Sequence, residues 1–302
     1  MVWPVNRRPF KSGFIAIIGA PNVGKSTLLN QLLGEKISIT SERPQTTRNR
    51  IMGVLHRPNA QFIFLDTPGV HHTRKKMNKR MIRVALSTLA DVDQILYLTD
   101  AARRDQGSDE LLLKTLASID KPVILAINKI DMIQNRKDLL PLIEAWGERH
   151  DFAAIVPISA LKNIQVEDLL DEMLALLPEG PGFFPEDTIT DQPARFIASE
   201  MIREKVFRLT SREVPYSVAV TIDAFKERPE KRRVDIEATI HVERDAQKGI
   251  LIGKGGTMLK RIGSAARIDI QRMTGTQVFL RLWVRVRKNW SRNAGQLSGF
   301  GY

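Results

Sequence analysis

The chain has 302 residues, of which 43% are hydrophobic and 26% charged, values typical of a globular protein and not of a disordered one. It has no cysteine, which excludes disulfides and thiolate metal sites, and its five histidines show no structural zinc pattern. We expect about two domains, no transmembrane helix and no signal peptide, and therefore a cytoplasmic protein.

The formal charge of +12 is unevenly distributed along the chain. Residues 1–180 carry +4 and the shorter part, residues 181–302, carries +8. Excess positive charge in one part indicates a polyanionic partner, with nucleic acid as the first choice and anionic lipid as the second. The alternative is a solvated basic surface that only keeps the protein soluble.

Short apolar runs alternate with helical segments in the first half of the chain. The runs are continuous rather than alternating, which is typical of strands buried on both faces of a parallel sheet. The pattern predicts an α/β domain, a mostly parallel sheet with helices on both faces. The predicted strands are 14–18, 61–66, 94–99, 122–128 and 153–159, and the predicted helices are 26–33, 78–90, 108–118 and 166–177.

The first motif follows the strand at 14–18 and opens a helix at Ser26. Its pattern, Gly19-x-x-x-x-Gly24-Lys25-Ser26, is a phosphate-binding loop in the strand-to-helix context that it needs. Backbone N–H groups and the helix N-terminus would hold phosphates, Lys25 would supply charge and Ser26 a Mg²⁺ ligand. The alternative is a chance glycine-rich turn.

A second motif, Asp66-Thr67-Pro68-Gly69, ends the strand at 61–66. The carboxylate of Asp66 can reach Mg²⁺, usually through water, and the Gly69 N–H can sense a γ-phosphate. Taken alone, these four residues are more typical of an ordinary turn that closes a strand.

Two further motifs follow later strands, where a ligand base would lie. In Asn128-Lys129-Ile130-Asp131, a carboxylate at Asp131 can accept from the two N–H donors of guanine, a donor pair that adenine lacks. A buried carboxylate in that role would discriminate sharply, because the wrong base leaves it unpaired. Ser159-Ala160-Leu161 could donate a backbone N–H to the base oxygen.

These four motifs, in this order and at these strand ends, resemble the GTPases of the translation-factor-related class. The resemblance implies a GTPase that converts GTP to GDP and phosphate and uses Mg²⁺. The residues that it assigns to the nucleotide are Gly19, Ala20, Pro21, Asn22, Val23, Gly24, Lys25, Ser26, Thr27, Asp66, Thr67, Pro68, Gly69, Val70, Asn128, Lys129, Asp131, Ser159, Ala160 and Leu161.

Residues 39–53 form a polar connector with little core-forming content. A threonine hydroxyl here could complete the Mg²⁺ shell when GTP is bound and release it after hydrolysis. Thr47 is the first choice because it precedes Arg48, and Thr46 is close behind. The predicted metal ligands are therefore Ser26, Thr47 and Asp66, and the alternative for the connector is an ordinary solvated loop.

The residue after the second motif is Val70, at the place where Ras-like GTPases have the glutamine that orients water. Valine has no donor or acceptor, so that route is closed. The resemblance implies instead that Asn22 helps hold a monovalent cation, typically K⁺, beside the phosphates. The alternative is that Asn22 only shapes the loop. The predicted catalytic residues are Asn22, Lys25, Thr47 and Gly69, and slow intrinsic turnover is expected.

Five basic residues lie within the stretch 71–80. A solvated charge run is the favoured interpretation, and contact with RNA or another protein is the alternative.

The pattern changes after the stretch 177–193, which is rich in proline, glycine and acidic residues and indicates a linker. Helical spacing follows over 193–209. Three segments with alternating apolar residues then predict half-buried strands, and such alternation predicts an antiparallel sheet with one open face. These segments are 216–222, 234–242 and 278–286, and a helix near 257–273 lies between the last two.

The order helix, strand, strand, helix, glycine turn, helix, strand resembles a type II KH domain, a smaller α+β fold. The signature Gly-x-x-Gly is matched by Gly253-Lys254-Gly255-Gly256, and such a loop clamps the backbone of about four nucleotides. Lys260 and Arg261 would lie one turn further on. We therefore expect RNA binding at these six residues, and the alternative is a glycine-rich corner with no ligand.

A GTPase domain joined to a C-terminal KH domain resembles the bacterial Era GTPase family over almost the whole chain. Segments that carry the resemblance include "PQTTR", "FPEDTITDQPARFIASEMIREKV", "EVPYSV" and "LWVRVRKNW". It implies binding to the 3′ region of 16S rRNA, a role in small ribosomal subunit assembly, a monomeric state and partial association with the inner membrane face. The predicted parts are a flexible tail 1–12, the GTPase domain 13–180, a linker 181–193, the KH domain 194–290 and a tail 291–302.

Two other functions stay open from the sequence. The first is a GTP-dependent switch whose basic C-terminal domain docks to a membrane or a protein instead of RNA. The second is a related GTPase that modifies or handles tRNA, although no cofactor or metal site for that chemistry is found in the sequence.

Overall fold

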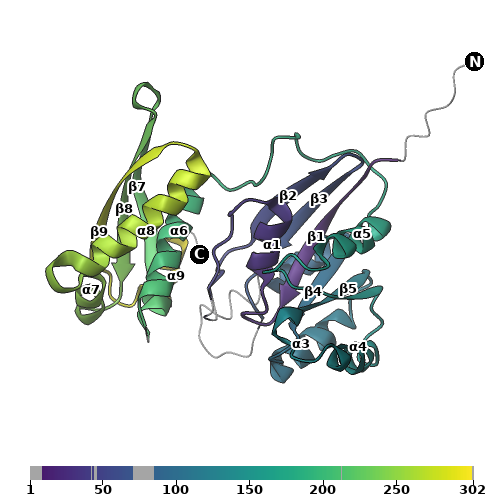
Figure 1. Cartoon of the computed structure of the whole chain (residues 1–302). Helices are drawn as coiled ribbons and strands as arrows, with labels where there is room; N and C mark the ends of the chain where they lie inside the picture. Colours follow the sequence, from purple (N-terminus) through teal and green to yellow (C-terminus); the bar gives the residue numbers. More distant parts are fainter. Residues whose placement is uncertain (1–8, 42, 44–45, 71–84, 212, 301–302) are drawn as a thin grey trace, which may run out of the picture. The chain divides into compact units, whose positions relative to one another are not determined.

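The structure is a computed structural model that describes residues 9–41, 43, 46–70, 85–211 and 213–300. These residues form two compact units (Figure 1). The first unit holds residues 9–34, 49–70 and 85–191, and the second holds the remainder, including residues 35–48 as far as they are described. The domain boundaries expected from the sequence stay a prediction.

The first unit is built on a six-stranded sheet in the order β2-β3-β1-β4-β5-β6. All neighbours are parallel except β2, which pairs antiparallel with β3. The predicted α/β class and its mostly parallel sheet are thereby confirmed. The strands are β1 (Lys11–Gly19), β2 (Ile51–Arg57), β3 (Ala60–Asp66), β4 (Gln94–Asp100), β5 (Val123–Asn128) and β6 (Ala154–Pro157).

Helices cover this sheet, and its central strands are buried along their whole length, as continuous apolar runs predict. The helices are α1 (Lys25–Leu33), α3 (Gln106–Leu116), α4 (Leu139–Gly147) and α5 (Val166–Leu176), with short 3₁₀ turns at Thr88–Asp91, Ile130–Met132 and Arg136–Asp138. α4 was not predicted, although its Trp146 is fully buried in the core of the unit. The predicted helix 78–90 falls largely outside the described residues.

β2 was also missed by the sequence analysis, which treated residues 39–53 as a connector. Gly53 and the polar end of the strand, His56 and Arg57, weaken its apolar pattern. The free edge of β2 is completed by the chain that leaves the unit, because the Val54 N–H donates to the Ile189 carbonyl at 2.8 Å. The Thr190 hydroxyl donates to the Met52 carbonyl at 2.6 Å.

The second unit contains a three-stranded sheet in the order β7-β8-β9, with helices packed on one face (Figure 1). The order helix, strand, strand, helix, glycine turn, helix, strand is as predicted. The elements are α6 (Ala194–Leu209), β7 (Ala219–Arg228), β8 (Arg233–Val242), α7 (Asp245–Ile252), α8 (Thr257–Thr274), β9 (Gln277–Val286) and α9 (Ala294–Gly299), with 3₁₀ turns at Pro215–Ser217, Pro229–Lys231, Lys254–Gly256 and Trp290–Arg292.

One prediction for this sheet was wrong. β7 and β8 are antiparallel, but β8 and β9 are parallel. Alternation of apolar residues shows that a strand is half buried and carries no information about the direction of its neighbour. The direction follows from the connection, because a crossover through α7 and α8 returns the chain to the same end of the sheet.

α8 is the longest helix of the second unit, at 18 residues. Its apolar side buries Ile262, Ala266 and Ile270 against the sheet, whereas Lys260 and Arg261 are exposed.

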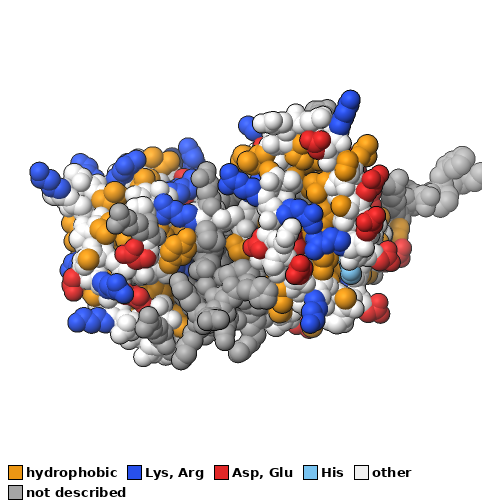
Figure 2. Space-filling view, turned by 90° about the horizontal axis from the view of Figure 1, so that it is seen from below, with side chains coloured by type: hydrophobic (Ala, Val, Ile, Leu, Met, Phe, Trp, Pro, Cys, Tyr) orange, Lys and Arg blue, Asp and Glu red, His pale blue; other side chains and the backbone are white. Residues whose placement is uncertain are grey.

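Figure 2 shows Lys and Arg side chains spread over the visible face of this unit. Across the part of the chain that the structure describes, no helix has both the length and the apolar character to cross a bilayer.

Candidate functional site

The phosphate loop lies between β1 and α1, and its two glycines are required by close contacts. A Cβ on Gly19 would lie 2.3 Å from the Leu98 carbonyl oxygen, and a Cβ on Gly24 would lie 2.3 Å from Nδ2 of Asn128. Gly24 also has φ +105°, which side chains other than glycine rarely allow. The loop therefore packs tightly against Leu98 of β4 and Asn128 of β5, at the carboxyl ends of the parallel strands.

Lys25 is buried in this loop, and its Nζ donates to the carbonyls of Gly19 at 3.0 Å and Ala20 at 2.8 Å. Burial lowers the pKa of Lys25 to about 8, and the nearby Asp66 carboxylate opposes part of that effect. A lysine in this position is a cation held close to the loop by weak carbonyl acceptors, and phosphate oxygens are stronger acceptors for the same donors.

Ser26 and Asp66 are brought together from α1 and β3. The Ser26 hydroxyl donates to Oδ2 of Asp66 at 2.7 Å, and Asp66 is fully buried. A hydroxyl and a carboxylate oxygen at this separation can both lie in the oxygen shell of one Mg²⁺ ion, which usually keeps waters and phosphates as its other ligands. These two predicted metal ligands therefore fit the ion chemically.

The second motif packs directly against the phosphate loop. Thr67 donates its hydroxyl to the Ile17 carbonyl at 2.8 Å, and the Val70 N–H donates to the Gly19 carbonyl at 3.2 Å. A Cβ on Gly69 would lie 2.8 Å from Cα of Pro21. The Val70 side chain is fully buried in the core of the unit. Only the backbone of Val70 can therefore act at the site.

Asn128 connects the phosphate loop to the loop after β6. Its Nδ2 donates to the Val23 carbonyl at 2.7 Å, and its Oδ1 accepts from the Ala160 N–H at 2.9 Å. Asn128 is buried, and both ends of its amide are used in this way. Asn128 thus joins the loop predicted to bind phosphates to the loop predicted to bind the base.

Asp131 and Ser159 also meet, since the Ser159 hydroxyl donates to Oδ1 of Asp131 at 2.6 Å. Asp131 is exposed, in contrast to the buried carboxylate that the sequence analysis envisaged. The 3₁₀ turn that carries it begins after Lys129, on the surface, so the bound base itself would have to exclude water from this carboxylate. In the loop after β6, the N–H groups of Ser159 and Ala160 already donate to Ile164 and Asn128.

Asp100, at the end of β4, is a site residue that the sequence analysis missed. Its Oδ2 accepts from Nζ of Lys129 at 2.6 Å, and its Oδ1 accepts from the N–H groups of Ala102 and Arg103. Lys129 Nζ also donates to the Asn22 carbonyl at 2.7 Å. The signal was present in the sequence, because Asp100 stands at the end of a buried strand. Asp66 and Asn128 have the same position at the ends of their strands.

Asn22, the predicted cation ligand, has φ +66° and an exposed side chain. Asparagine tolerates this left-handed conformation better than most residues. The conformation accounts for asparagine here on its own, so the role of its side chain in catalysis stays a prediction.

Residues 35–48 belong to the second unit as far as they are described, and the threonines predicted to bind Mg²⁺ are within them. The Thr46 carbonyl accepts from Nη2 of Arg203, and its hydroxyl donates to the Arg43 carbonyl at 2.8 Å. Thr47 is buried, and its assignment as a metal ligand stays a prediction.

The start of this segment is held by ion pairs. Lys36 lies 2.6 Å from Oε2 of Glu204 and 2.7 Å from Oδ2 of Asp269, and Lys205 pairs with the same two carboxylates. Glu204 is fully buried, and hydrogen bonds from Lys36 and Lys205 outweigh its burial, so its pKa is lowered. The segment is therefore anchored to α6 and α8.

The Gly253–Gly256 loop joins α7 to α8 in the second unit. Gly253, Gly255 and Gly256 all have positive φ, at 71°, 60° and 79°. Lys254 and Gly255 are exposed, and a Cβ on Gly255 or Gly256 would meet nothing within 4 Å. The loop is thus open for a polymer backbone to approach.

The basic stretch 71–80 lies outside the described residues.

Two family models match the chain over these two regions. The model described as "50S ribosome-binding GTPase" matches residues 14–129, and the model of the KH domain matches residues 213–291. Together with the phosphate loop, the base-binding loops and the exposed Gly-x-x-Gly turn, they define the class of this protein. It is a P-loop GTPase with a C-terminal KH domain.

Curated relatives match over nearly the full length. The GTPase Era of Geobacter metallireducens is 53% identical over 97% of this chain and 98% of its own length, and that of Geotalea uraniireducens is 52% identical over 99% and 100%. The crystal structure of a single-residue variant of Aquifex aeolicus Era bound to GDP·AlF₄⁻ matches with a TM-score of 0.93 and 44% identity, over 97% of this chain and 99% of that one. The chain belongs to the Era family of GTPases.

A second solved structure matches with the same TM-score of 0.93 and 44% identity, again over 97% of this chain and 99% of that one. It is described as Era in complex with MgGDPNP and nucleotides 1506–1542 of 16S ribosomal RNA.

Proposed function

We propose that this GTPase is a switch that binds the 3′ region of 16S rRNA and acts in the assembly of the small ribosomal subunit. The observation that carries the RNA part is the exposed Gly253–Gly256 loop, whose backbone is open to phosphates and followed by Lys260 and Arg261. The +8 charge of residues 181–302 supports a polyanionic ligand. The complex of the Era relative with nucleotides 1506–1542 supports the choice of RNA.

At the nucleotide site, each residue has a proposed task. Backbone N–H groups of residues 19–27 hold the phosphates, Lys25 neutralises charge on the terminal phosphates, and the Gly69 N–H contacts the γ-phosphate. Asp131, oriented by Ser159, reads the guanine edge. The N–H groups of Ser159 and Ala160 already donate to other groups of the protein. The proposed donor to the base oxygen is therefore the N–H of Leu161.

The proposed metal is Mg²⁺, held by Ser26 and by Asp66, with Thr47 added in the GTP state. When bound, the ion bridges phosphate oxygens and offsets their developing charge. Ser26 and Asp66 are already 2.7 Å apart, which supports their sharing one ion. Because residues 35–48 contact α6, the addition of Thr47 would connect the GTP state to that helix.

We also propose that Asn22 helps hold K⁺ beside the phosphates, where the ion supplies the charge that an arginine supplies in other GTPases. The buried Val70 side chain, which has no group to orient water, motivates this proposal. Steady-state GTP hydrolysis in KCl is expected to exceed that in NaCl. Equal rates in the two salts would remove the K⁺ assignment and leave Asn22 with a structural role.

The RNA assignment is tested with an oligonucleotide of the sequence of nucleotides 1506–1542 in the presence of GDP or a non-hydrolysable GTP analogue. The double variant Gly255→Asp and Gly256→Asp places two carboxylates where phosphates would lie. It is expected to lose RNA binding by about a hundredfold or more while GDP affinity is unchanged, because like charges oppose the contact. RNA affinity retained by this variant would contradict the assignment.

Gly275→Asp is the matched control. Gly275 has φ +65° and nothing within 4 Å of its Cβ position, so the substitution carries the same backbone strain at the other end of α8. It should lose stability to the same degree as one of the two loop substitutions and keep binding to short RNA. A control that loses RNA as fully as the double variant would show that unfolding, not charge, explains the result.

Localisation and oligomeric state complete the proposal. We place the protein in the cytoplasm as a monomer, with peripheral contact to the inner membrane face through its basic second unit. Competition between the rRNA oligonucleotide and anionic vesicles distinguishes RNA binding from membrane docking, which salt dependence alone cannot do because both respond to salt.

A further inference from the structure

The sheet of the second unit has two faces, and helices α6, α7 and α8 pack on only one of them. Along β9, Val278 and Val284 are buried toward these helices, and Leu280 and Leu282 share their face because strand side chains alternate. The opposite face of β9 carries an outer row of four residues: Phe279, Arg281, Trp283 and Arg285.

The aromatic members of the outer row are open to solvent. Phe279 is 45% exposed and Trp283 is 40% exposed, whereas Trp146 and Trp290 are fully buried. The C-terminal segment covers the far end of this face, where the Phe300 ring lies 4.7 Å from the ring of His241. His241 pairs with Arg285, so this cover ends where the outer row ends. Phe279 and Trp283 lie beyond it.

Positive charge surrounds the two rings. The neighbouring strands add Lys226, Arg228 and Arg233 on the same face, so five cations oppose the three carboxylates of Asp223, Asp235 and Glu237. Three arginines are paired with those carboxylates, at 2.7 Å for Arg233–Asp235, 3.4 Å for Arg228–Asp235 and 3.5 Å for Arg281–Glu237. The net charge of the face is positive, which suits a polyanion.

Guanidinium groups alternate with the rings and also flank one of them. Arg233 and Arg281 lie 5.5 Å and 5.3 Å from the centroid of the Phe279 ring. Phe279 and Trp283 are about 13 Å apart along an extended strand. Rings on which bases stack, separated by cations that meet phosphates, are the two elements with which proteins hold single-stranded nucleic acid.

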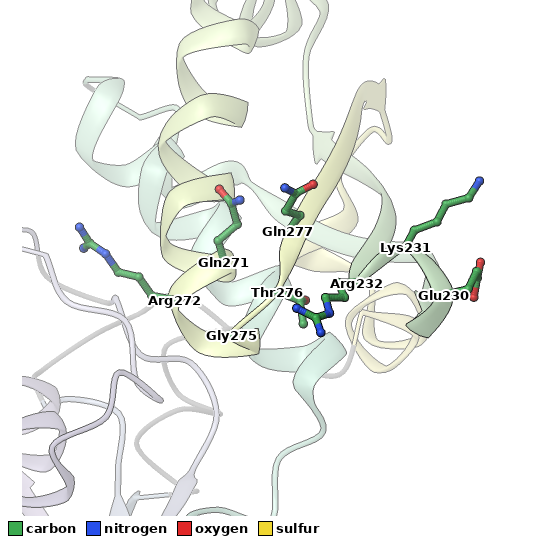
Figure 3. A pocket seen from close by; sticks show the side chains of 8 residues that line it. All are labelled: Glu230, Lys231, Arg232, Gln271, Arg272, Gly275, Thr276 and Gln277. Carbon is green, nitrogen blue, oxygen red and sulfur yellow. The ribbon is translucent and has the colours of Figure 1, made fainter.

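A hollow next to Gln277, at the start of β9, is lined by residues of the β7–β8 turn and the end of α8. Figure 3 shows the side chains of Lys231 and Arg272 pointing in opposite directions there. Because these cations diverge, the hollow does not gather charge around one anion. The outer row, with its aligned side chains, is the better-formed surface.

We propose that the outer row binds a second segment of RNA, an unpaired stretch whose bases stack on Phe279 and Trp283 and whose phosphates meet Arg281 and Arg285. This inference rests on the proposed function, in which the Gly253–Gly256 loop clamps about four nucleotides of the same RNA. The second segment extends the contact to a face of the sheet that the clamp does not use.

The test measures binding to the oligonucleotide of nucleotides 1506–1542 and to overlapping five-nucleotide pieces of it. Two double variants are made. One combines Phe279→Ala with Trp283→Ala, and the other combines Arg281→Gln with Arg285→Gln. Each is expected to weaken binding to the long RNA by at least about tenfold. Neither should change binding of the best five-nucleotide piece or of GDP. Trp283→Phe should restore most of the affinity, since phenylalanine also offers a face for stacking.

Two matched controls lie on the first unit. Lys121→Gln removes an exposed cation, and Leu140→Ala removes a side chain that is 67% exposed. Both should leave long-RNA binding unchanged. Tryptophan fluorescence gives a second readout, because a base stacked on Trp283 should quench its emission and Trp283→Phe should abolish that change.

Unchanged long-RNA affinity in both outer-row variants overturns the inference. If the variants lose affinity for the five-nucleotide pieces as much as for the long RNA, the inference is also overturned, because such a loss would indicate damage to the Gly253–Gly256 loop. Unchanged RNA affinity together with lost binding to intact small subunits would assign the face to a protein partner and overturn the RNA assignment. If the wild-type chain binds none of the RNAs, the proposed function itself is overturned. This outcome is distinguishable from failure of the outer-row inference, because it is seen in the wild-type protein and not in the variants.

Discussion

The two glycine-rich loops of this molecule differ in what requires their glycines. In the loop before α1, a Cβ on Gly19 or Gly24 would overlap protein atoms at 2.3 Å. In the loop before α8, a Cβ on Gly255 or Gly256 would meet nothing within 4 Å, and only the positive φ angles favour glycine. The first loop is enclosed by protein atoms, as its proposed small ligand requires, whereas the second is open, as the proposed contact with a polymer requires.

Gly24→Ala is expected to have the largest effect on the first loop. The new Cβ overlaps Asn128 and needs a φ of +105°, so the loop must move away from the base-binding residues. We expect GDP affinity to fall by about a hundredfold or more, measured by titration calorimetry, and short-RNA binding to be kept.

Gly34→Ala is its control, because Gly34 also has a positive φ, +69°, but open space around it. This variant should lose only about 1 kcal/mol of stability and keep its GDP affinity. If Gly24→Ala behaved like Gly34→Ala, the enclosed description of the first loop would be wrong.

Removal of Mg²⁺ should separate the two loops next. With EDTA in place of Mg²⁺, GTP affinity is expected to fall by about tenfold to a hundredfold, because the proposed ligands Ser26 and Asp66 would no longer share an ion with the phosphates. Binding of five-nucleotide RNA in GDP-free protein should change little at constant ionic strength. A metal requirement of equal size for both ligands would contradict the separation.

Asn128→Ala tests how the first loop is kept in place. The variant leaves the Val23 carbonyl and the Ala160 N–H without their buried partner, at a cost of about 1–3 kcal/mol. We expect GDP affinity to fall by about tenfold and the first unit to melt earlier in calorimetry. The exposed Lys121→Gln substitution serves as the control, and an Asn128→Ala protein with wild-type affinity would show that the two loops are aligned by other contacts.

The smallest effects belong to alanine substitutions in the second loop. Gly255→Ala and Gly256→Ala should each lose about 1 kcal/mol of stability, the cost of a left-handed backbone alone. Gly253→Ala should lose more, because its Cβ would lie 2.8 Å from Cβ of Met258. Urea unfolding of the three variants measures this order, and a Gly255→Ala protein less stable than Gly253→Ala would reverse it.

The sequence was sufficient for the fold class and for the parts of the site that follow buried strands. Each predicted strand of the first unit was found because short, continuous apolar runs are typical of strands buried on both faces of a parallel sheet. β2 was missed because its glycine and polar end weaken the pattern and its edge is completed by Ile189 and Thr190, which are far away in the sequence.

Contacts between residues distant in the chain account for what could not be predicted. Nothing in the local sequence says that the Asn128 amide joins Val23 to Ala160, or that Lys129 pairs with Asp100. The exposure of Asp131 depends on the turn that carries it, and the parallel pairing of β8 and β9 depends on the helices between them. The roles of Asn22 and Thr47 stay predictions.

Ion pairs and a hydrogen bond hold residues 35–48 to the rest of the second unit. Their second residue, Lys36, is bound to carboxylates on α6 and α8, and Arg48 donates to the Val218 carbonyl at 2.7 Å. The stretch expected to respond to GTP is thus held at both ends by the unit that carries the Gly-x-x-Gly turn. Any movement of this stretch away from α6 and α8, which the proposed switch would require, must overcome the free energy of those ion pairs, and weakening Lys36 would lower that cost.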